Sequence, residues 1–346
     1  MTQQPHDARE IPAMAHRRVA LLLPGQGAQH AGMAVPLYEH DHTFAAIVED
    51  FFDLMGEEGS RIRADWLGSD PQLPVDDGRR AQPLLFVIGY AIGRVLERRG
   101  IRPDVLLGHS VGELAAACLA GVFDLESAAR IMLARSRVLA TAPPGGMLAV
   151  AAAPERVESG IAPEWAERGV VVGAVNAPAQ TVLAGPEAEL ALAAAALSEA
   201  GLVVRRVRAR EPFHSPVLDE AALDFEKAVA AETLNPPRVE IRSARTARTV
   251  RPEEAVDPAF WARQMAEPIL YWPALGALLD DGAFTFVEAG PGRSLSAPAR
   301  RHPAVRSGRS GVVCTLPAEG GDCLRVWNAA TEQLGALLAP EAMASG

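Results

Sequence analysis

One serine in this chain lies in a glycine-flanked sequence that directly suggests covalent chemistry. It lies in Gly108-His109-Ser110-Val111-Gly112, after the apolar residues 105–107 and before the small, helix-prone residues 113–117. A strand that turns sharply into a helix with a serine at the turn is the nucleophile-elbow pattern. The first N–H groups of such a helix are directed toward the place where an oxyanion would form. The pattern therefore predicts that Ser110 is a nucleophile.

A serine nucleophile needs a base, and the chain has eight histidines. The sequence around His30 does not decide whether it is a candidate base. His109 adjoins the serine, but the turn should direct its side chain away from Ser110. His214 lies just past a predicted subdomain junction, where a loop can enter a cleft. It is therefore either the base or a satisfied loop histidine that helps to start the next helix. The others have settings typical of solvated or surface side chains: His6, His16, His40, His42 and His302.

Composition excludes several other classes of function. The formal charge of −10 opposes bulk attraction to nucleic acid. The sequence has no zinc spacing, Walker motif or dinucleotide fingerprint, so it predicts neither a metal nor a bound cofactor. The scattered cysteines Cys118, Cys314 and Cys323 suit a reducing compartment. No apolar run is long enough to span a bilayer, and the first residues lack a signal-peptide pattern. We therefore expect a cytoplasmic protein without a membrane segment.

The elements that must position the serine alternate as in an α/β domain. Strands are predicted at 19–23, 105–107 and 284–288, and helices at 83–99, 125–139, 218–232 and 258–265. Pro143-Pro144-Gly145-Gly146 is a linker signal. After it, residues 147–207 show the order strand, helix, two strands, helix, strand, which is the ferredoxin-like signature.

These patterns predict a large α/β-hydrolase-like domain with a parallel sheet and an inserted small ferredoxin-like (βαββαβ) subdomain. The expected boundaries are a disordered lead at 1–17, the large catalytic domain at 18–143 and 209–335, the subdomain at 144–208 and a frayed tail at 336–346. The chain departs from ordinary α/β-hydrolases, which place an acid and then a histidine after the serine. Only His302 could serve that order, and its setting among arginines is poor.

Several motifs in a fixed order resemble those of the malonyl-CoA:acyl-carrier-protein transacylase family, which includes the acyltransferase domains of polyketide synthases. The resemblance runs from about residue 19 to about residue 299. The motifs that carry it are Pro24-Gly25-Gln26-Gly27-Ala28-Gln29, Gly108-His109-Ser110-Val111-Gly112-Glu113, Leu133-Ala134-Arg135-Ser136-Arg137, Asn176-Ala177-Pro178, Ala184-Gly185-Pro186, Pro212-Phe213-His214-Ser215, Arg263-Gln264-Met265 with Pro268, and Glu288-Ala289-Gly290-Pro291-Gly292.

The resemblance implies a role for each residue at the reacting centre. Ser110 would be the acylated nucleophile, and His214 its general base and later the general acid. The backbone carbonyl of Gln264 would orient the histidine and fix its tautomer. The backbone N–H groups of Gln26 and Val111 would form the oxyanion hole. Family members work with a Ser-His dyad, so no third acid is expected.

The resemblance also implies the substrate class. Arg135 matches the arginine that binds the free carboxylate of malonyl-type units, for which a planar guanidinium is suited; the alternative is a surface arginine. Gln82 either lines the same pocket or is a helix N-terminal residue before Pro83. A bulky residue at Phe213, just before the histidine, favours malonyl over methylmalonyl groups because the ring would clash with a C2 branch.

Glu211 does not fit this picture. A carboxylate near the pocket would repel malonate unless it faces solvent, and it could instead hold an amine. The rival hypothesis is therefore a transacylase that moves an aminoacyl or other non-malonyl group between carrier proteins. A second rival is an acyl-thioester hydrolase that uses the same dyad, although family hydrolases tend to lose the carboxylate arginine. A non-catalytic scaffold is hard to reconcile with these residues.

The expected partners are acyl-CoA as donor and an acyl carrier protein whose phosphopantetheine thiol accepts the group, in polyketide or fatty-acid biosynthesis. The chain begins with Met1 and shows no ketosynthase segment, so we expect a discrete, trans-acting protein that is a monomer. Carrier proteins are typically acidic, so docking needs a local basic patch. Two clusters are candidates for this patch, although each is equally well explained as an ordinary solvated surface. Their residues are Arg205, Arg206, Arg208, Arg300, Arg301 and Arg306.

Overall fold

The computed structural model describes residues 17–338 of the chain. Its larger part is built around a five-stranded parallel sheet in the order β7-β2-β1-β8-β9. The central strands are almost fully buried, as expected for a parallel sheet with both faces covered. The strands are β1 (Arg18–Leu23), β2 (Val105–Gly108), β7 (Glu240–Ser243), β8 (Phe284–Glu288) and β9 (Gly311–Cys314).

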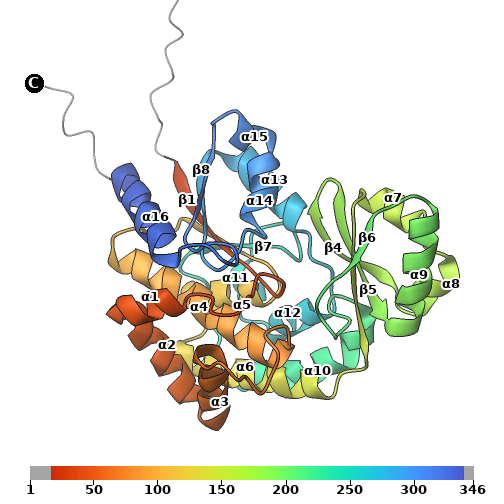
Figure 1. Cartoon of the computed structure of the whole chain (residues 1–346), viewed down its shortest axis with the longest axis horizontal. Helices are drawn as coiled ribbons and strands as arrows, with labels where there is room; N and C mark the ends of the chain where they lie inside the picture. The colour runs from red at the N-terminus through yellow and green to blue at the C-terminus, as the bar shows by residue number, and fades with distance from the viewer. Residues whose placement is uncertain (1–16, 339–346) are drawn as a thin grey trace, which may run out of the picture.

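Helices pack on both faces of this sheet (Figure 1). Helix α5 packs against β1, β2 and β7, and α4 packs against α5. Helix α16 packs against β9 and α1, which places the last helix beside the first (Figure 1). The helices of the larger part are α1 (Val35–His40), α2 (His42–Met55), α3 (Glu57–Leu67), α4 (Gly78–Arg98), α5 (Val111–Leu119), α6 (Leu125–Ala140), α10 (Asp219–Val229), α11 (Pro252–Ala255), α12 (Pro258–Ala262), α13 (Tyr271–Asp281), α14 (Ser296–Arg301), α15 (Pro303–Arg306) and α16 (Cys323–Leu338), with 3-10 turns η1 (Pro216–Leu218) and η2 (Arg263–Met265).

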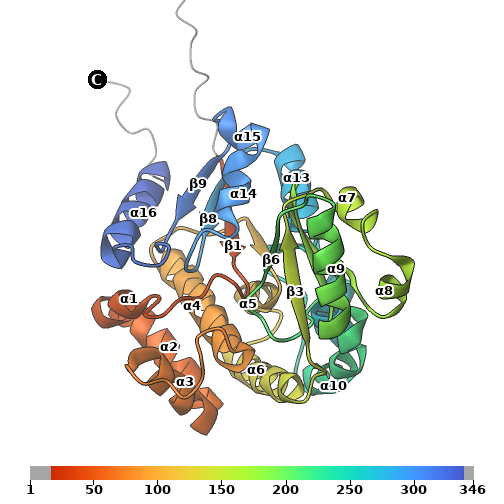
Figure 2. The same ribbon diagram turned by 45° about the vertical axis from the view of Figure 1, so that its right-hand side comes forward.

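The smaller part is a four-stranded antiparallel sheet in the order β4-β5-β3-β6. In chain order its elements run strand, two short helices, two strands, helix, strand, so the predicted fold class is confirmed. Helix α9 lies along one face of this sheet (Figure 2). The elements are β3 (Gly145–Val150), α7 (Pro154–Glu158), α8 (Pro163–Glu167), β4 (Val171–Ala177), β5 (Gln180–Pro186), α9 (Glu187–Glu199) and β6 (Val204–Arg206).

The smaller sheet has its own hydrophobic core under α9, to which Leu148 and Val150 belong. Alternation along β3 turns Met147 and Ala149 to the opposite face, toward the larger part. The two parts are joined by main-chain hydrogen bonds: Ile269 N–H donates to Gly173, and Val175 N–H donates to Ile269 at 2.8 Å. The small sheet therefore forms one wall of whatever site lies between the parts.

The structure refines several predicted bounds. Helix α4 begins at Gly78 rather than at 83, because the Asp77 side chain accepts from Arg79 N–H and caps the helix. The expected helix at 258–265 is divided into α12 and the 3-10 turn η2. Helix α16 continues three residues into the predicted tail at 336–346, and residues 339–346 lie outside the described part, as do residues 1–16 of the predicted lead. The domain boundaries remain predictions.

None of the helices within residues 17–338 is both long and apolar enough to cross a membrane.

Candidate active site

Ser110 lies at the sharp turn between β2 and α5, at the carboxyl edge of the parallel sheet. Its backbone has φ 53° and ψ −122°, a conformation that side-chain-bearing residues rarely adopt. The turn requires glycine on each side, because a Cβ on Gly112 would lie 2.0 Å from the Leu23 carbonyl oxygen and one on Gly108 would lie 2.3 Å from the Glu113 nitrogen. The predicted elbow is thus present, with its hydroxyl held at the start of a buried helix.

His214 contacts this serine. Its Nε2 lies 3.0 Å from Ser110 Oγ. Its Nδ1 lies 3.0 Å from the Gln264 carbonyl oxygen and 2.9 Å from that of Glu267. Because carbonyls only accept, Nδ1 carries the hydrogen and Nε2 is left to accept from the serine hydroxyl. This is the tautomer that a base for Ser110 needs.

The histidine is neutral at ordinary pH. Burial lowers the pKa of His214 to about 3, and the nearby His109 and Arg135 act in the same direction. The ring can therefore take a proton from Ser110 without first having to lose one. The sequence left open whether His214 is a base or a satisfied loop residue, and the geometry favours the base.

The predicted oxyanion donors lie beside the dyad. Gln26 follows β1 and Val111 follows β2, and adjacent parallel strands bring the loops after them to one edge. Within residues 17–338, the backbone N–H groups of Gln26 and Val111 donate to no protein acceptor. Gln26 also lines the cavity in front of Ser110. Both N–H groups are thus available, and their role as an oxyanion hole remains a prediction.

Arg135 is fully buried, so it is not a surface arginine. Its Nε donates to Oε1 of Gln82 at 2.6 Å. Both terminal nitrogens lack a partner within the described residues, and the guanidinium faces the rings of Phe213 and Phe225 at 6.0 and 5.5 Å. Burial lowers the pKa of Arg135 to about 10, which leaves it protonated at neutral pH. A buried cation with free donors is unfavourable unless an anion completes it.

Gln82 links this arginine to the loop after β1. It is buried inside α4 rather than preceding the helix. Its Nε2 donates to Oε1 of Gln26 at 2.9 Å, and Gln26 Nε2 donates to the Asp76 carbonyl at 3.1 Å. The resulting chain of hydrogen bonds, from Arg135 through Gln82 and Gln26 to Asp76, orients the arginine relative to the oxyanion loop.

A cavity of about 220 Å³ opens in front of the dyad, between the larger part and the small sheet. His109 lines it too, and its Nε2 donates to Asn176 of β4 at 2.9 Å. Phe213 forms part of the wall. The remaining lining is mostly apolar or small: Gly25, Gly27, Met147, Ala149, Ala174, Gln180, Val182, Val207, Ser294 and Leu295.

Glu211 lies beside this cavity rather than among its lining residues. Its Oε2 is buried without a partner in the described part, and it lies 3.7 Å from the place that a Cβ on Gly78 would take, a place that the Gln26 and Gln82 side chains also approach. Burial raises the pKa of Glu211, while Asp77 acts in the same direction and Arg79 opposes it. The Glu211 carboxyl group therefore does not simply face solvent, contrary to one of the two expectations stated above.

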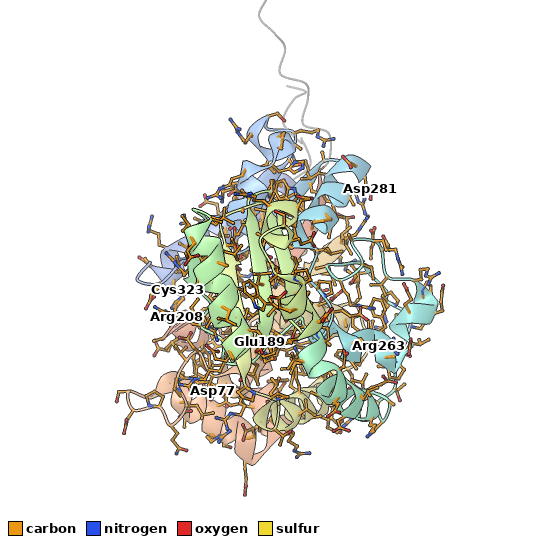
Figure 3. The ribbon with its side chains drawn as sticks, turned by 90° about the vertical axis from the view of Figure 1, so that its right-hand side faces the viewer. Asp77, Glu189, Arg208, Arg263, Asp281 and Cys323 are labelled. Atoms are coloured by element: carbon orange, nitrogen blue, oxygen red, sulfur yellow. The ribbon has the colours of Figure 1, made fainter. Side chains whose placement is uncertain are left out.

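The basic residues proposed for docking lie in different surroundings. Arg206 pairs with Glu187, and Arg208 lies 4.0 Å from Asp76. These side chains line an open groove of about 500 Å³ that shares Val207 with the cavity, and Asp77 and Arg208 of this groove are labelled in Figure 3. Arg205 is exposed. In the second cluster Arg300, Arg301 and Arg306 are all exposed, and Arg300 donates to the Val312 carbonyl at 3.1 Å.

Sequence reasoning missed the Glu267 carbonyl at the back of His214. A main-chain acceptor leaves no signature in residue type, so only the fold of the turn after η2 could reveal it. The contact between His109 and Asn176 was also not foreseen, although both residues belong to motifs that the sequence singles out.

Comparisons with known proteins identify relatives of the chain as a whole. Residues 21–316 match the family model described as the acyl transferase domain. Over 306 residues the chain is 38% identical to a component of the phenolphthiocerol/phthiocerol polyketide synthase of Mycobacterium tuberculosis, which covers 86% of this chain and 20% of that protein. It is 33% identical to polyketide synthase GfsA of Streptomyces halstedii, over 88% of this chain and 4% of that protein. The chain thus spans a fifth or less of the length of these curated relatives.

Solved structures show the same architecture. The acyltransferase domain from the second module of the salinomycin polyketide synthase has a TM-score of 0.83 and 33% identity, covering 91% of this chain and 72% of that one. The malonyl-CoA:acyl carrier protein transacylase of Xanthomonas oryzae has a TM-score of 0.78 and 27% identity, covering 91% of this chain and 99% of that one.

Proposed function

We propose that this chain, which belongs to the acyl transferase domain family, moves a malonyl-type acyl group from coenzyme A to the phosphopantetheine thiol of an acyl carrier protein. One observation carries the choice of acyl group: the buried Arg135 guanidinium keeps two nitrogens without a protein partner among the described residues. A free carboxylate on the acyl group would complete this site with a bidentate pair. Relatives named for polyketide synthesis support a place in polyketide or fatty-acid biosynthesis.

In the first half-reaction, His214 Nε2 takes the proton of Ser110 as Oγ attacks the thioester carbonyl. The carbonyl oxygen becomes an oxyanion that the N–H groups of Gln26 and Val111 stabilise. Collapse breaks the carbon–sulfur bond, and the imidazolium returns its proton to the leaving thiolate. The products are an acylated Ser110, free coenzyme A and a neutral histidine.

The second half-reaction repeats these steps with the carrier thiol. His214 removes the thiol proton, the thiolate attacks the serine ester, and the oxyanion forms at the same donors. Collapse breaks the ester bond, and the imidazolium protonates Ser110 Oγ. No third acid is needed, because the Gln264 and Glu267 carbonyls stabilise the imidazolium through its Nδ1–H.

Phe213 supports an unbranched malonyl group. Its ring is buried, lines the cavity next to His214 and faces the Arg135 guanidinium. A carboxylate held by Arg135 would therefore place C2 of the acyl group near this ring, where an added methyl group has least room.

The unpartnered carboxyl oxygen of Glu211 favours a second candidate. A transacylase that moves an aminoacyl group between carrier proteins would use this oxygen to accept from the amine. In that case Glu211→Gln would stop loading of amino-bearing groups, and malonyl transfer would be absent from the start. An acyl-thioester hydrolase remains the third possibility for the same dyad, and it predicts release of the acyl group to water without any carrier protein.

The test is intact-mass analysis after incubation with malonyl-, methylmalonyl- and acetyl-CoA and with an aminoacyl thioester. We expect a malonyl adduct that is absent in Ser110→Ala and reduced in Arg135→Met. Adding a separately produced carrier protein should discharge the adduct, which also tests action in trans. Loss of the adduct to water at an equal rate without carrier would support the hydrolase, and an adduct from the aminoacyl thioester alone would support the second candidate.

A further inference from the structure

Behind His214, away from the substrate cavity, lies a group of charged and polar side chains that the acyl-transfer steps do not use. Glu113 is 1% exposed on α5, and Arg245 follows β7. The side chains of Gln264 and Glu267 lie between these residues and the histidine. Burying such groups is unfavourable without a compensating role, because each loses its hydration.

One arm of this group runs from the elbow helix to the first carbonyl. The Gln264 side chain donates through Nε2 to the Ser110 carbonyl oxygen and, at 3.4 Å, to Oε2 of Glu113. The Gln264 main chain supplies one of the two acceptors for His214 Nδ1–H. The same residue therefore ties the histidine to the backbone of the nucleophile and to Glu113.

The other arm runs from the end of β7 to the second carbonyl. Arg245 donates through a terminal nitrogen to Oε2 of Glu267, and its guanidinium lies 4.2 Å from the centre of the Phe260 ring. Glu267 supplies the second acceptor for His214 Nδ1–H at 2.9 Å. Arg245 is largely buried, whereas Glu267 is 39% exposed on its side chain, so the arginine holds a residue that would otherwise be free to move.

We infer that Glu113 and Arg245 are positioning residues, which hold His214 in the Nδ1–H tautomer by anchoring the side chains of Gln264 and Glu267, whose carbonyls accept from that hydrogen. A third catalytic acid would fix the imidazole through one side chain. Here the acceptors are main-chain oxygens in η2 and the turn that follows it, and their place depends on what secures that segment. The two anchors attach this segment to β2 and β7, which are neighbours in the sheet. Glu113 does so through α5, which follows β2, and Arg245 through the end of β7.

The two anchors are also close to each other. Burial raises the pKa of Glu113, and the Ser243 hydroxyl, Arg245 and Gln264 lower it. Ser243 Oγ in turn accepts from the Arg245 backbone N–H at 3.1 Å. The end of β7 therefore lies near both arms, and α5 packs against β7.

This inference rests on the proposed role of His214 as the base. Its test reads the histidine directly by long-range ¹⁵N–¹H correlation NMR on protein labelled at histidine, with the signal assigned by its loss in His214→Gln. In the wild type we expect one tautomer with the hydrogen on Nδ1. In Glu113→Met and Arg245→Met we expect a mixture of tautomers. The rate constant for acylation should fall about 10- to 100-fold with an unchanged KM for the acyl donor.

Conservative variants separate positioning from general damage. Glu113→Gln keeps an oxygen acceptor for Gln264, and Arg245→Lys keeps a cation for Glu267, so both should recover most of the rate and the single tautomer. Arg248→Met is the matched control, because Arg248 lies on the same loop but pairs with Glu254, which does not contact His214 or its two carbonyl acceptors. It should leave the tautomer and the rate as in the wild type.

Should the buried variants fail to fold, Glu267→Ala tests the second arm, since it removes a partly exposed side chain and leaves the main-chain carbonyl in place. A folded Glu267→Ala, Arg245→Met or Glu113→Met protein with one tautomer and wild-type acylation would overturn the inference. A wild type that reacts with no acyl donor would instead overturn the proposed function, while the tautomer measurement would still report on the anchors.

Discussion

The Nε–H of Arg135 donates to Oε1 of Gln82 over 2.6 Å, and this bond determines which donors of the guanidinium remain for a ligand. With Nε engaged, the two terminal nitrogens are left side by side, which is one of the geometries that binds a carboxylate bidentately. Gln82 thus sets the orientation of the arginine without needing to touch the acyl group.

Gln82→Leu should therefore weaken malonyl binding more than acetyl binding. The variant removes the acceptor for Arg135 and the donor for Gln26, so the guanidinium loses its fixed orientation. We expect KM for malonyl-CoA to rise about 10-fold, as for the loss of a hydrogen bond to a charged group. Steady-state kinetics with acetyl-CoA as the comparison substrate measure the difference; equal changes for both substrates would contradict the orienting role.

Arg135→Lys should fail to replace the arginine. An ammonium at the end of a flexible stem cannot offer the planar pair of donors, so kcat/KM for malonyl-CoA should fall by about 100-fold or more in both Arg135→Lys and Arg135→Met. Arg130→Met is the control, because Arg130 lies on the same helix but pairs with Glu126 and Glu232 at the surface. Near-normal activity of the lysine variant would show that charge alone is sufficient.

Phe213→Ala should relax the selection against a branch at C2. Removing the ring opens space between His214 and Arg135, and the methylmalonyl-to-malonyl ratio of kcat/KM should rise about 10-fold, the usual scale for one methyl group. Competition between the two CoA esters, read by intact mass, measures this ratio directly. The melting temperature is needed beside it, because truncating a buried phenylalanine destabilises by about 3–5 kcal/mol.

Acid should destabilise the protein partly through His214. Its pKa is about 3 in the folded protein, below its ordinary value of 6.5, so the unfolded chain binds more protons between these values. Stability from this residue is therefore complete above about pH 6.5 and is lost as the pH falls toward 3, on the order of 1 kcal/mol per pH unit within that window. His214→Gln should flatten this slope in urea titrations at several pH values. His109, whose pKa burial also lowers, contributes a slope that the variant retains.

Arg208→Glu should weaken the use of the carrier protein but not of acyl-CoA. The Arg208 side chain is 84% exposed on the groove that shares Val207 with the cavity, where an acidic partner would meet it. We expect KM for the carrier protein to rise and KM for acyl-CoA to stay unchanged. Lys227→Glu, an equally large charge change on α10, is the control. If both variants behave like the wild type, docking uses a different surface.

The elbow and the ferredoxin-like insertion could be predicted because local rules determine them. Glycine is the residue that fits two positions before and two positions after Ser110. Strand and helix periods along 147–207 give the order of elements without any long-range information. The start of α4 was missed because Pro83 is typical of a first helical turn, while the actual cap at Asp77 lies upstream.

Other features depend on contacts that no local pattern encodes. The role of Gln82 arises from two side chains on different elements, Gln26 and Arg135, which the chain brings together only after folding. The two carbonyls behind His214 belong to the main chain, and Glu113 looks in sequence like an ordinary first-turn acid of a helix.

The backbone of Ser110 has a broader consequence. A backbone with φ 53° and ψ −122° is favourable for glycine and strained for serine, so the residue proposed as the nucleophile also lowers the stability of the fold. Selection for stability and selection for catalytic activity therefore favour different residues at this position.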